Sequence, residues 1–154
     1  MRKGDVVTDF ELLDETGTPR RLSGFLADGP VVLFFYPIAM SPGCTVESCH
    51  FRDLVSDFKA VGAQPVGISP DRPETQQRFA QKHAFGYPLL ADTDQSVARQ
   101  FGVKGWLPML PIQRVTFVID SDARVLEVIR SEIWMNMHAD RALDVLKKRA
   151  ATSG

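Results

Sequence analysis

The sequence has few of the residues that mark specialised classes of protein. It has only 2 cysteines, 3 histidines, 2 tryptophans and 2 tyrosines among 154 residues. Two cysteines are too few for the disulfide framework of a small secreted domain. The scattered histidines lack the paired spacing of a structural zinc site. We therefore expect no metal site, and any pairing of the two cysteines is expected to be transient.

Neither sign of charge dominates, and no apolar run is long. The 18 lysines and arginines nearly balance the 19 aspartates and glutamates, so the formal net charge is −1. This balance argues against nucleic acid or an anionic membrane as a partner. The longest apolar run, residues 31–36, is far too short to span a bilayer. The basic start, residues 1–3, is followed by Gly4-Asp5 rather than by the apolar segment of a signal peptide, and we expect a cytoplasmic protein.

Hydrophobic spacing predicts an α/β fold. Buried or half-buried strands are expected at residues 31–36, 65–69, 115–119 and 125–129, with a hairpin formed by 10–13 and 20–22 and a short extended piece at 87–90. Helices are expected over 45–61, 73–83, 94–101 (capped by Thr93 or Asp94) and 140–149, with a loop at 104–113 and a frayed tail at 150–154.

The order of these elements indicates the topology. Strand, helix and strand over residues 31–69 predict a right-handed parallel βαβ unit, and 115–129 predicts an antiparallel hairpin. We therefore predict a single thioredoxin-like domain over residues 1–154, with a mixed central sheet and helices on both faces. The expected loop at 104–113 contains several large apolar residues, at Trp106–Ile112, which either pack into the core or form an exposed contact patch.

The two cysteines lie five residues apart, where a strand leads into a helix. The turn at 37–43 contains proline and glycine and places Cys44 in the first turn of that helix. There, unpaired backbone N–H groups and the helix dipole stabilise a thiolate. A thiolate attacks peroxide oxygen and becomes a sulfenic acid, which condenses with a second thiol to form a disulfide. Cys49 is the obvious second thiol, although it is also in phase with an apolar helix face.

Helical geometry keeps the two cysteines apart. Residues five apart in a helix differ by about 140° and about 7.5 Å of rise, so their Cα atoms lie roughly 8–9 Å apart. A disulfide needs a Cα separation below about 7 Å. A Cys44–Cys49 bond therefore requires residues 43–50 to unwind, and we expect this helix start to be the least stable ordered part of the fold.

Other residues near the cysteines allow more than one interpretation. Ser41 supplies a hydroxyl that acts either as a helix cap or as a partner for the sulfur or the substrate. Gly43 allows a substrate to approach the backbone closely. His50 invites a metal interpretation beside Cys49, which the histidine spacing does not support. Trp134 and its neighbouring methionines are expected to serve packing.

The motif Pro37-x-x-x-Ser41-x-x-Cys44 resembles the peroxiredoxin active-site motif, Pro-x-x-x-Thr/Ser-x-x-Cys. The longer run is similar to the peroxiredoxin Q, or bacterioferritin comigratory protein, subgroup: Phe35-Tyr36-Pro37 … Pro42-Gly43-Cys44-Thr45-x-Glu47-x-Cys49-x-Phe51-Arg52-Asp53. The similarity continues through 66–69, 87–92, 101–103 and 114–120, and thus covers roughly residues 4 to 130 in order.

The resemblance implies a role for each matching residue. Cys44 matches the cysteine that attacks the peroxide, and Cys49 matches the resolving cysteine of this subgroup. Ser41 takes the place of the usual threonine, whose hydroxyl contacts the peroxide. Arg114 matches an arginine that faces the sulfur, where its permanent charge stabilises the thiolate and the charge developing on the peroxide.

Three further residues are expected to line the substrate pocket. Pro37 matches the motif proline that shields the cysteine, and Gly43 precedes the cysteine directly. Glu47 matches an acidic residue of the same helix, whose part the resemblance leaves open. Serine in place of threonine keeps the hydroxyl but loses the methyl group that restricts its rotamer.

The resemblance implies a thiol peroxidase that resolves through an intramolecular Cys44–Cys49 disulfide and is recycled by a thioredoxin-like reductant. No cofactor is required, because the thiolate itself supplies two electrons. We expect a monomer or a weak homodimer. The main alternative is a peroxide-responsive redox sensor that uses the same disulfide switch to bind a partner. A copper chaperone using both cysteines and a histidine, and a disulfide reductase, which would carry Cys-x-x-Cys, fit the sequence less well.

Overall fold

A seven-stranded mixed sheet forms the centre of the computed structural model, which describes residues 1–107 and 110–153. The strand order is β2-β1-β5-β4-β3-β8-β9. The strands are β1 (Glu11–Asp14), β2 (Pro19–Arg21), β3 (Val31–Phe35), β4 (Gln64–Ser69), β5 (Leu89–Ala91), β8 (Val115–Ile119) and β9 (Val125–Arg130). A separate ribbon pairs β6 (Lys104–Leu107) with β7 (Leu110–Ile112).

The strands in the middle of the sheet are apolar on both faces, which suits them to a position covered by helices on both sides. All five residues of β3 are buried, and β3 pairs in parallel with β4, which pairs in parallel with β5. On its other side, β3 pairs antiparallel with β8, and β8 pairs antiparallel with β9. The predicted βαβ unit and both predicted hairpins are therefore confirmed.

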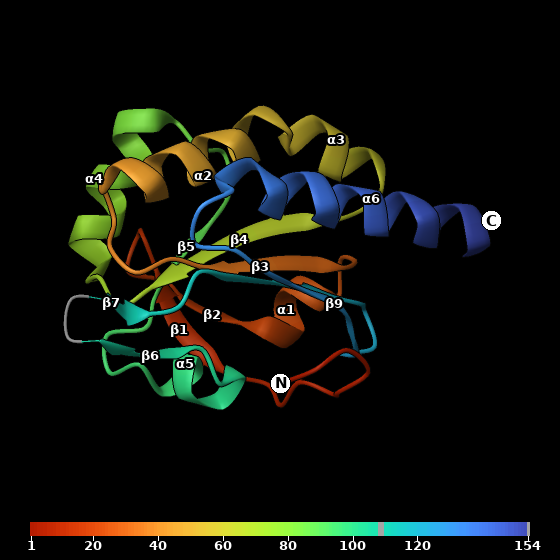
Figure 1. The fold of residues 1–154 in the computed structure, drawn as a ribbon, viewed down its shortest axis with the longest axis horizontal. Helices are drawn as coiled ribbons and strands as arrows, with labels where there is room; N and C mark the ends of the chain where they lie inside the picture. Colours follow the sequence, from red (N-terminus) through yellow and green to blue (C-terminus); the bar gives the residue numbers. More distant parts are fainter. Residues whose placement is uncertain (108–109, 154) are drawn as a thin grey trace.

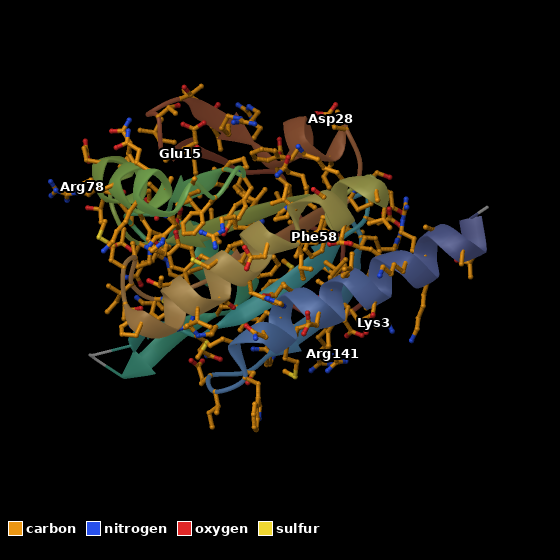
Figure 2. All side chains as sticks on the ribbon, turned by 90° about the horizontal axis from the view of Figure 1, so that it is seen from above. Lys3, Glu15, Asp28, Phe58, Arg78 and Arg141 are labelled. Carbon is orange, nitrogen blue, oxygen red and sulfur yellow. The ribbon has the colours of Figure 1, made fainter. Side chains whose placement is uncertain are left out.

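Helices cover both faces of the sheet (Figure 1). One face carries α2 (Pro42–Asp53), α3 (Val55–Ala60), α4 (Pro73–His83) and α6 (Met135–Ser153). The opposite face carries α1 (Leu22–Leu26) and α5 (Ser96–Phe101). α2 and α6 run side by side on the same face of the sheet (Figures 1 and 2).

Aromatic rings fill the layer between the sheet and the upper helices. Phe34 on β3 stacks on Phe51 of α2 with ring centroids 4.1 Å apart, and Phe51 stacks on Phe58 of α3 at 5.9 Å. All three side chains are fully buried, and Figure 2 shows Phe58 beneath its helix. This packing holds α2, which carries both cysteines, against the centre of the sheet.

The prediction of one helix over residues 45–61 is wrong, because two helices occupy this stretch. The backbone leaves helical geometry at Leu54, which has φ −101° and ψ 7°. Its N–H contacts the carbonyls of both His50 and Phe51. Apolar residues keep their helical spacing across this break, so the periodicity gives no sign of it.

The stretch predicted as a loop contains the two strands of the β6–β7 ribbon, Lys104–Leu107 and Leu110–Ile112. Lys104 pairs with Ile112, and Leu107 pairs with Leu110. Ile112 is buried in the core, whereas Pro108 and Met109 lie outside the described residues. Two prolines within ten residues suggested a loop, but a two-stranded ribbon tolerates proline at edge positions.

Two helix starts also differ from their predictions. α5 begins at Ser96 with Gln95 in the cap position, in place of the predicted Thr93 or Asp94. Asp94 still accepts a hydrogen bond from the Ser96 N–H, and the buried Asp92 accepts from the N–H groups of Val97 and Ala98. α6 begins five residues earlier than predicted and continues through 153, so residues 150–153 of the tail expected to fray are helical. Its first turn contains the polar His138, which obscured the apolar face. Within the described residues, no helix is long and apolar enough to cross a membrane.

Candidate active site

Cys44 lies in the first turn of α2, where the sequence placed it. Ser41 is the N-cap residue with an extended backbone (φ −68°, ψ 153°), and Pro42 occupies the first helical position. Pro42 suits this position because it has no N–H to satisfy and its φ is preset. The Cys44 side chain is fully buried, so its sulfur lies in a low-dielectric environment at the positive end of a helix.

Arg114 faces this sulfur, as the resemblance implied. Its guanidinium donates from Nη2 to Cys44 Sγ at 3.3 Å and from Nη1 to Glu47 Oε1 at 2.8 Å. The side chain is buried, and its backbone N–H donates to Glu132 Oε1 at 2.8 Å just before β8 begins. The planar fork of arginine thus bridges two acceptors on α2 that lie three residues apart.

Glu47 is fully buried beneath this contact. Burial raises the pKa of Glu47 to about 8, although the neighbouring Arg114 pulls in the opposite direction. Its second oxygen, Oε2, has no hydrogen-bond partner within the described part of the chain and lies 3.6 Å from His138 Nδ1. At neutral pH the carboxyl group therefore holds its proton more readily than a solvent-exposed glutamate does.

His138 reaches this site from α6 and is also fully buried. Its Nδ1 lies 2.8 Å from Thr116 Oγ1 on β8, and its Nε2 lies 2.9 Å from the carbonyl oxygen of Ser131. Burial lowers the pKa of His138, and the positive charge of Arg114 lowers it further. The ring is therefore predominantly neutral at physiological pH.

Ser41 does not cap α2 with its side chain. Its Oγ instead donates to the Ile38 carbonyl at 2.9 Å, within the turn. Among the roles expected for this hydroxyl, the cap is wrong, and the contact to the sulfur is not formed in this structure. Because the bond to Ile38 uses only the hydroxyl hydrogen, the lone pairs of Oγ are left for a substrate O–H.

The turn before α2 is fixed by a second polar contact. The Ala39 N–H donates to Asp71 Oδ2 at 2.7 Å, and the Ser69 hydroxyl donates to the same oxygen at 2.8 Å. Met40 adopts a positive φ of 68°, which turns the chain toward the helix. Pro37 is buried and ends the pairing of β3, since it has no N–H.

Gly43 lies in a crowded position. A Cβ atom there would lie 3.3 Å from Arg114 Nη2 and 3.3 Å from Met135 Cε. Glycine is needed because a side chain would press on the arginine that contacts the sulfur. Met135, at the start of α6, thus forms part of the wall beside Cys44.

Cys49 lies on the same helix, five residues or about 1.4 turns after Cys44. It is partly exposed, and both cysteines are free thiols. The Tyr87 hydroxyl donates to the Ser48 carbonyl at 2.6 Å, directly before Cys49. After it, His50 Nε2 lies 2.7 Å from Asp140 Oδ1 of α6. With α2 intact from Pro42 to Asp53, the two thiols are held apart.

A surface hollow of about 640 Å³ adjoins the start of α2 and α6, lined by Val46, Ile133, Trp134, Met135, Asn136, Met137 and Asp140. Trp134 is 71% exposed and Ile133 is 77% exposed. The expectation that Trp134 serves packing is therefore wrong. Within the described residues, no three histidine, cysteine or acidic side chains gather as a metal site would require.

The structure adds functional candidates to which sequence reasoning gave no role. These are Thr116, His138, Glu132, Tyr87 and Asp71, which hold the site together from five separate segments. Thr116 and Tyr87 lie within the stretches 114–120 and 87–92 that carry the resemblance, although the sequence assigned neither a role. The other three have no local signal, because their contacts depend on how distant segments pack.

A family comparison agrees with this geometry. A model of the AhpC/TSA family matches residues 3–128. The chain belongs to this family. Among relatives, a putative peroxiredoxin of Mycobacterium tuberculosis is 58% identical over 156 residues, covering 100% of both chains. The resemblance to peroxiredoxins is thus confirmed.

Solved peroxiredoxins share the fold. The crystal structure of peroxidoxin BcpB from Mycobacterium tuberculosis superimposes with a TM-score of 0.92 and 58% identity, covering 96% of this chain and 97% of that one. A structure of the Xanthomonas campestris bacterioferritin comigratory protein, studied for its alkyl peroxide reduction activity, gives a TM-score of 0.84 and 32% identity, covering 92% of each chain. The predicted thioredoxin-like peroxiredoxin fold is therefore confirmed.

Proposed function

We propose that this peroxiredoxin is a thiol-dependent peroxidase that reduces hydrogen peroxide and organic hydroperoxides. The observation that supports this most directly is the contact between Arg114 and the buried sulfur of Cys44 at a helix start. A cation and a helix N-terminus aimed at one sulfur are what a thiolate nucleophile requires. The family relationship points to the same chemistry.

In the first step, the Cys44 thiolate attacks the terminal oxygen of the peroxide. A sulfur–oxygen bond forms and the O–O bond breaks, leaving a sulfenic acid and an alkoxide or hydroxide that takes a proton to become an alcohol or water. Arg114 stabilises the negative charge as it moves from sulfur to the departing oxygen. The Ser41 hydroxyl accepts a hydrogen bond from the peroxide O–H, while Pro37 and Gly43 form the wall of the pocket.

In the second step, the Cys49 thiol attacks the sulfenic sulfur. A Cys44–Cys49 disulfide forms and one water molecule leaves. The first turns of α2 must unwind, because the intact helix keeps the thiols apart. A thioredoxin-like dithiol then reduces the disulfide by thiol exchange and restores both thiols.

Charge and surface exposure bear on where the protein acts and on its oligomeric state. The balanced charge supports a cytoplasmic protein that binds neither nucleic acid nor membrane. The protein is proposed to be a monomer or a weak homodimer, and the exposed apolar side chains Ile133 and Trp134 offer a small surface for such weak self-association. Sedimentation velocity of reduced protein over a hundredfold range of concentration tests this state.

The deciding experiment is peroxide consumption with a thioredoxin system, comparing wild type, Cys44→Ser and Cys49→Ser. We expect no turnover for Cys44→Ser. For Cys49→Ser we expect a single round of peroxide reduction that stops at the sulfenic acid. Retained turnover in Cys44→Ser would overturn the proposed function. Retained turnover in Cys49→Ser would only move the resolving role to another thiol.

A further inference from the structure

Behind Arg114 lies a buried pair of titratable groups that the proposed reaction leaves without a role. Glu47 on α2 and His138 on α6 are both fully buried, and Glu47 Oε2 lies 3.6 Å from His138 Nδ1. Within the described residues, Oε2 has no hydrogen-bond partner. An unpartnered buried carboxyl oxygen is costly, unless a proton joins it to a neighbour. We call these two residues the acid–base pair.

The contacts of the ring define where its protons lie. His138 Nε2 faces the Ser131 carbonyl at 2.9 Å, and a carbonyl can only accept, so Nε2 carries a hydrogen. Nδ1 of the neutral ring is then an acceptor, which takes a hydrogen bond from the Thr116 hydroxyl at 2.8 Å. The same atom becomes a donor when the ring is protonated. A protonated ring and the carboxylate would then lie within ion-pair distance, with 3.6 Å between Nδ1 and Oε2, so the pair is neutral whichever member carries the proton.

The charges that face this pair come from several elements. Arg114 donates to Glu47 Oε1 and to Cys44 Sγ at once. Glu132, from the β9–α6 connection, adds negative charge that acts on both members of the pair. Tyr87, from the segment before β5, faces the carboxyl group and holds its proton, because burial raises the pKa of Tyr87 well above 10. Arg114 is therefore the cation over which the thiolate and the carboxyl group compete.

We propose that the buried pair Glu47 and His138 together keep one proton, carried by either member, and that this proton reserves the charge of Arg114 for the Cys44 thiolate. The inference rests on the proposed function, since it makes the pair a positioning device for the same reaction. With the proton on either member, the pair is neutral as a whole. When the proton leaves to solvent base, a carboxylate remains at Oε1 and divides the arginine charge between two anions.

The proposal predicts an alkaline limit to peroxide reduction that is set by the pair. Below this limit, rising pH increases the thiolate fraction and the rate. Above it, loss of the shared proton weakens the stabilisation of the thiolate and of the departing oxygen, so the rate falls. A shift of the limit by one pH unit changes the rate about tenfold at pH values above it.

Two substitutions distinguish the effect of the proton held by the pair from the effect of its side-chain packing. Glu47→Gln mimics the protonated carboxyl and cannot lose the proton. His138→Gln keeps an amide N–H for the Ser131 carbonyl but cannot bind a proton as the ring does. The measurement is the second-order rate constant of reduced protein with hydrogen peroxide from about pH 5.5 to about pH 9.5. Wild type, both single variants and the double variant are compared.

We expect wild type to lose rate at alkaline pH and His138→Gln to lose it at lower pH. Glu47→Gln should show no alkaline loss, and the double variant should follow the Glu47→Gln profile. An alkaline limit that survives Glu47→Gln would overturn the proposal. The proposal would also be overturned if His138→Gln slowed the reaction equally at every pH, both in wild type and in Glu47→Gln. That result would mean that His138 acts only through its packing.

A measurement on the unreacted protein tests the shared proton independently of any peroxidase activity. The measurement is the ¹⁵N chemical shift of the ring nitrogens in reduced wild type labelled with ¹⁵N-histidine. The shift of His138 Nδ1 should change in one step over the pH range in which the rate falls, with His50 and His83 as internal references. A Nδ1 signal that stays constant across this range would overturn the proposal. If wild type shows no reaction with peroxide, the proposed function fails, while the titration still decides whether the pair shares a proton.

Discussion

At the scale of single residues, Arg114 connects the reactive sulfur to the buried carboxyl group of Glu47. Its two terminal nitrogens contact Cys44 Sγ and Glu47 Oε1 at 3.3 and 2.8 Å. No other side chain type offers two parallel donors with a permanent charge. The arginine therefore both stabilises the thiolate and compensates the burial of a carboxyl group.

We expect Arg114→Lys to slow the reaction with peroxide by about 10- to 1,000-fold, although the charge is conserved. A single ammonium group cannot reach the sulfur and the carboxyl group with the geometry of the fork. The measurement is the second-order rate constant of reduced protein. Arg78→Lys, at an exposed position on α4 (Figure 2), is the control and should react as wild type. Equal rates for both variants would contradict the role assigned to the fork.

The buried carboxyl group should also make stability depend on pH. The pKa of Glu47 is about 8 in the folded protein and near 4.5 when the chain is unfolded. Between these values the folded state holds a proton that the unfolded state has lost, so stability falls as pH rises, by up to about 1.4 kcal/mol per pH unit. Glu47→Gln should remove this decline. Urea unfolding of reduced protein at several pH values from about 5.5 to 7.5 measures it. Parallel pH profiles for wild type and variant would refute the expectation.

At the scale of the element, α2 must be both a rigid support and a segment that unwinds. Its first turn activates Cys44, and its apolar side packs through Phe51 on Phe34. The Tyr87 hydroxyl donates to the Ser48 carbonyl, between the two cysteines and directly before Cys49. This bond stabilises the folded form of the helix, in which the thiols cannot meet.

We expect Tyr87→Phe to speed formation of the Cys44–Cys49 disulfide after a peroxide pulse. Loss of a buried hydrogen bond of about 1 kcal/mol makes unwinding roughly fivefold more favourable. Amide hydrogen exchange over residues 43–50 should rise in the reduced protein as well.

Tyr36→Phe is the matched control, because it removes a buried hydroxyl that bonds Gln76 on α4 rather than α2. It should leave both the disulfide rate and exchange at 43–50 unchanged. If the two tyrosine variants behave alike, the hydroxyl of Tyr87 has no special effect on α2. Equal exchange protection at 43–50 in reduced and oxidised wild type would show that unwinding does not accompany the disulfide.

At the scale of the whole molecule, α6 contributes both to the stability of the fold and to the structure of the cysteine site. Its buried residues Ala142, Leu143 and Leu146 cover the sheet, while its first turn delivers His138 and Met135 to the cysteine pocket. The helix also lies beside α2 (Figure 2). The packing of one helix therefore stabilises the fold and positions groups behind Arg114.

We expect Leu146→Ala to lower the free energy of unfolding by about 2–5 kcal/mol, because a fully buried leucine leaves a cavity. Asp144→Ala, at an exposed position of the same helix, should change it by less than about 0.5 kcal/mol. Urea unfolding of reduced protein measures both. A cost below 1 kcal/mol for Leu146→Ala would mean that α6 contributes little to the core.

The sequence by itself determined the central strands, the βαβ unit, both hairpins and the placement of Cys44 at a helix start. These features depend on local patterns, such as the apolar run at 31–36 and the proline and glycine beside the cysteine. The same patterns could not show the break at Leu54, since apolar spacing continues across it. They also missed the β6–β7 ribbon and the early start of α6, because strand pairing and the burial of His138 depend on distant partners.

Only the tertiary structure decided what surrounds the sulfur. The contact of Arg114 with Cys44 joins residues 70 positions apart. The approach of His138 to Glu47 requires α6 to pack beside α2, and the bond from Tyr87 to Ser48 requires the chain to return along the sheet. A thiol's neighbours in space are set by packing, so the sequence could identify the nucleophile but not the charges and protons that control it.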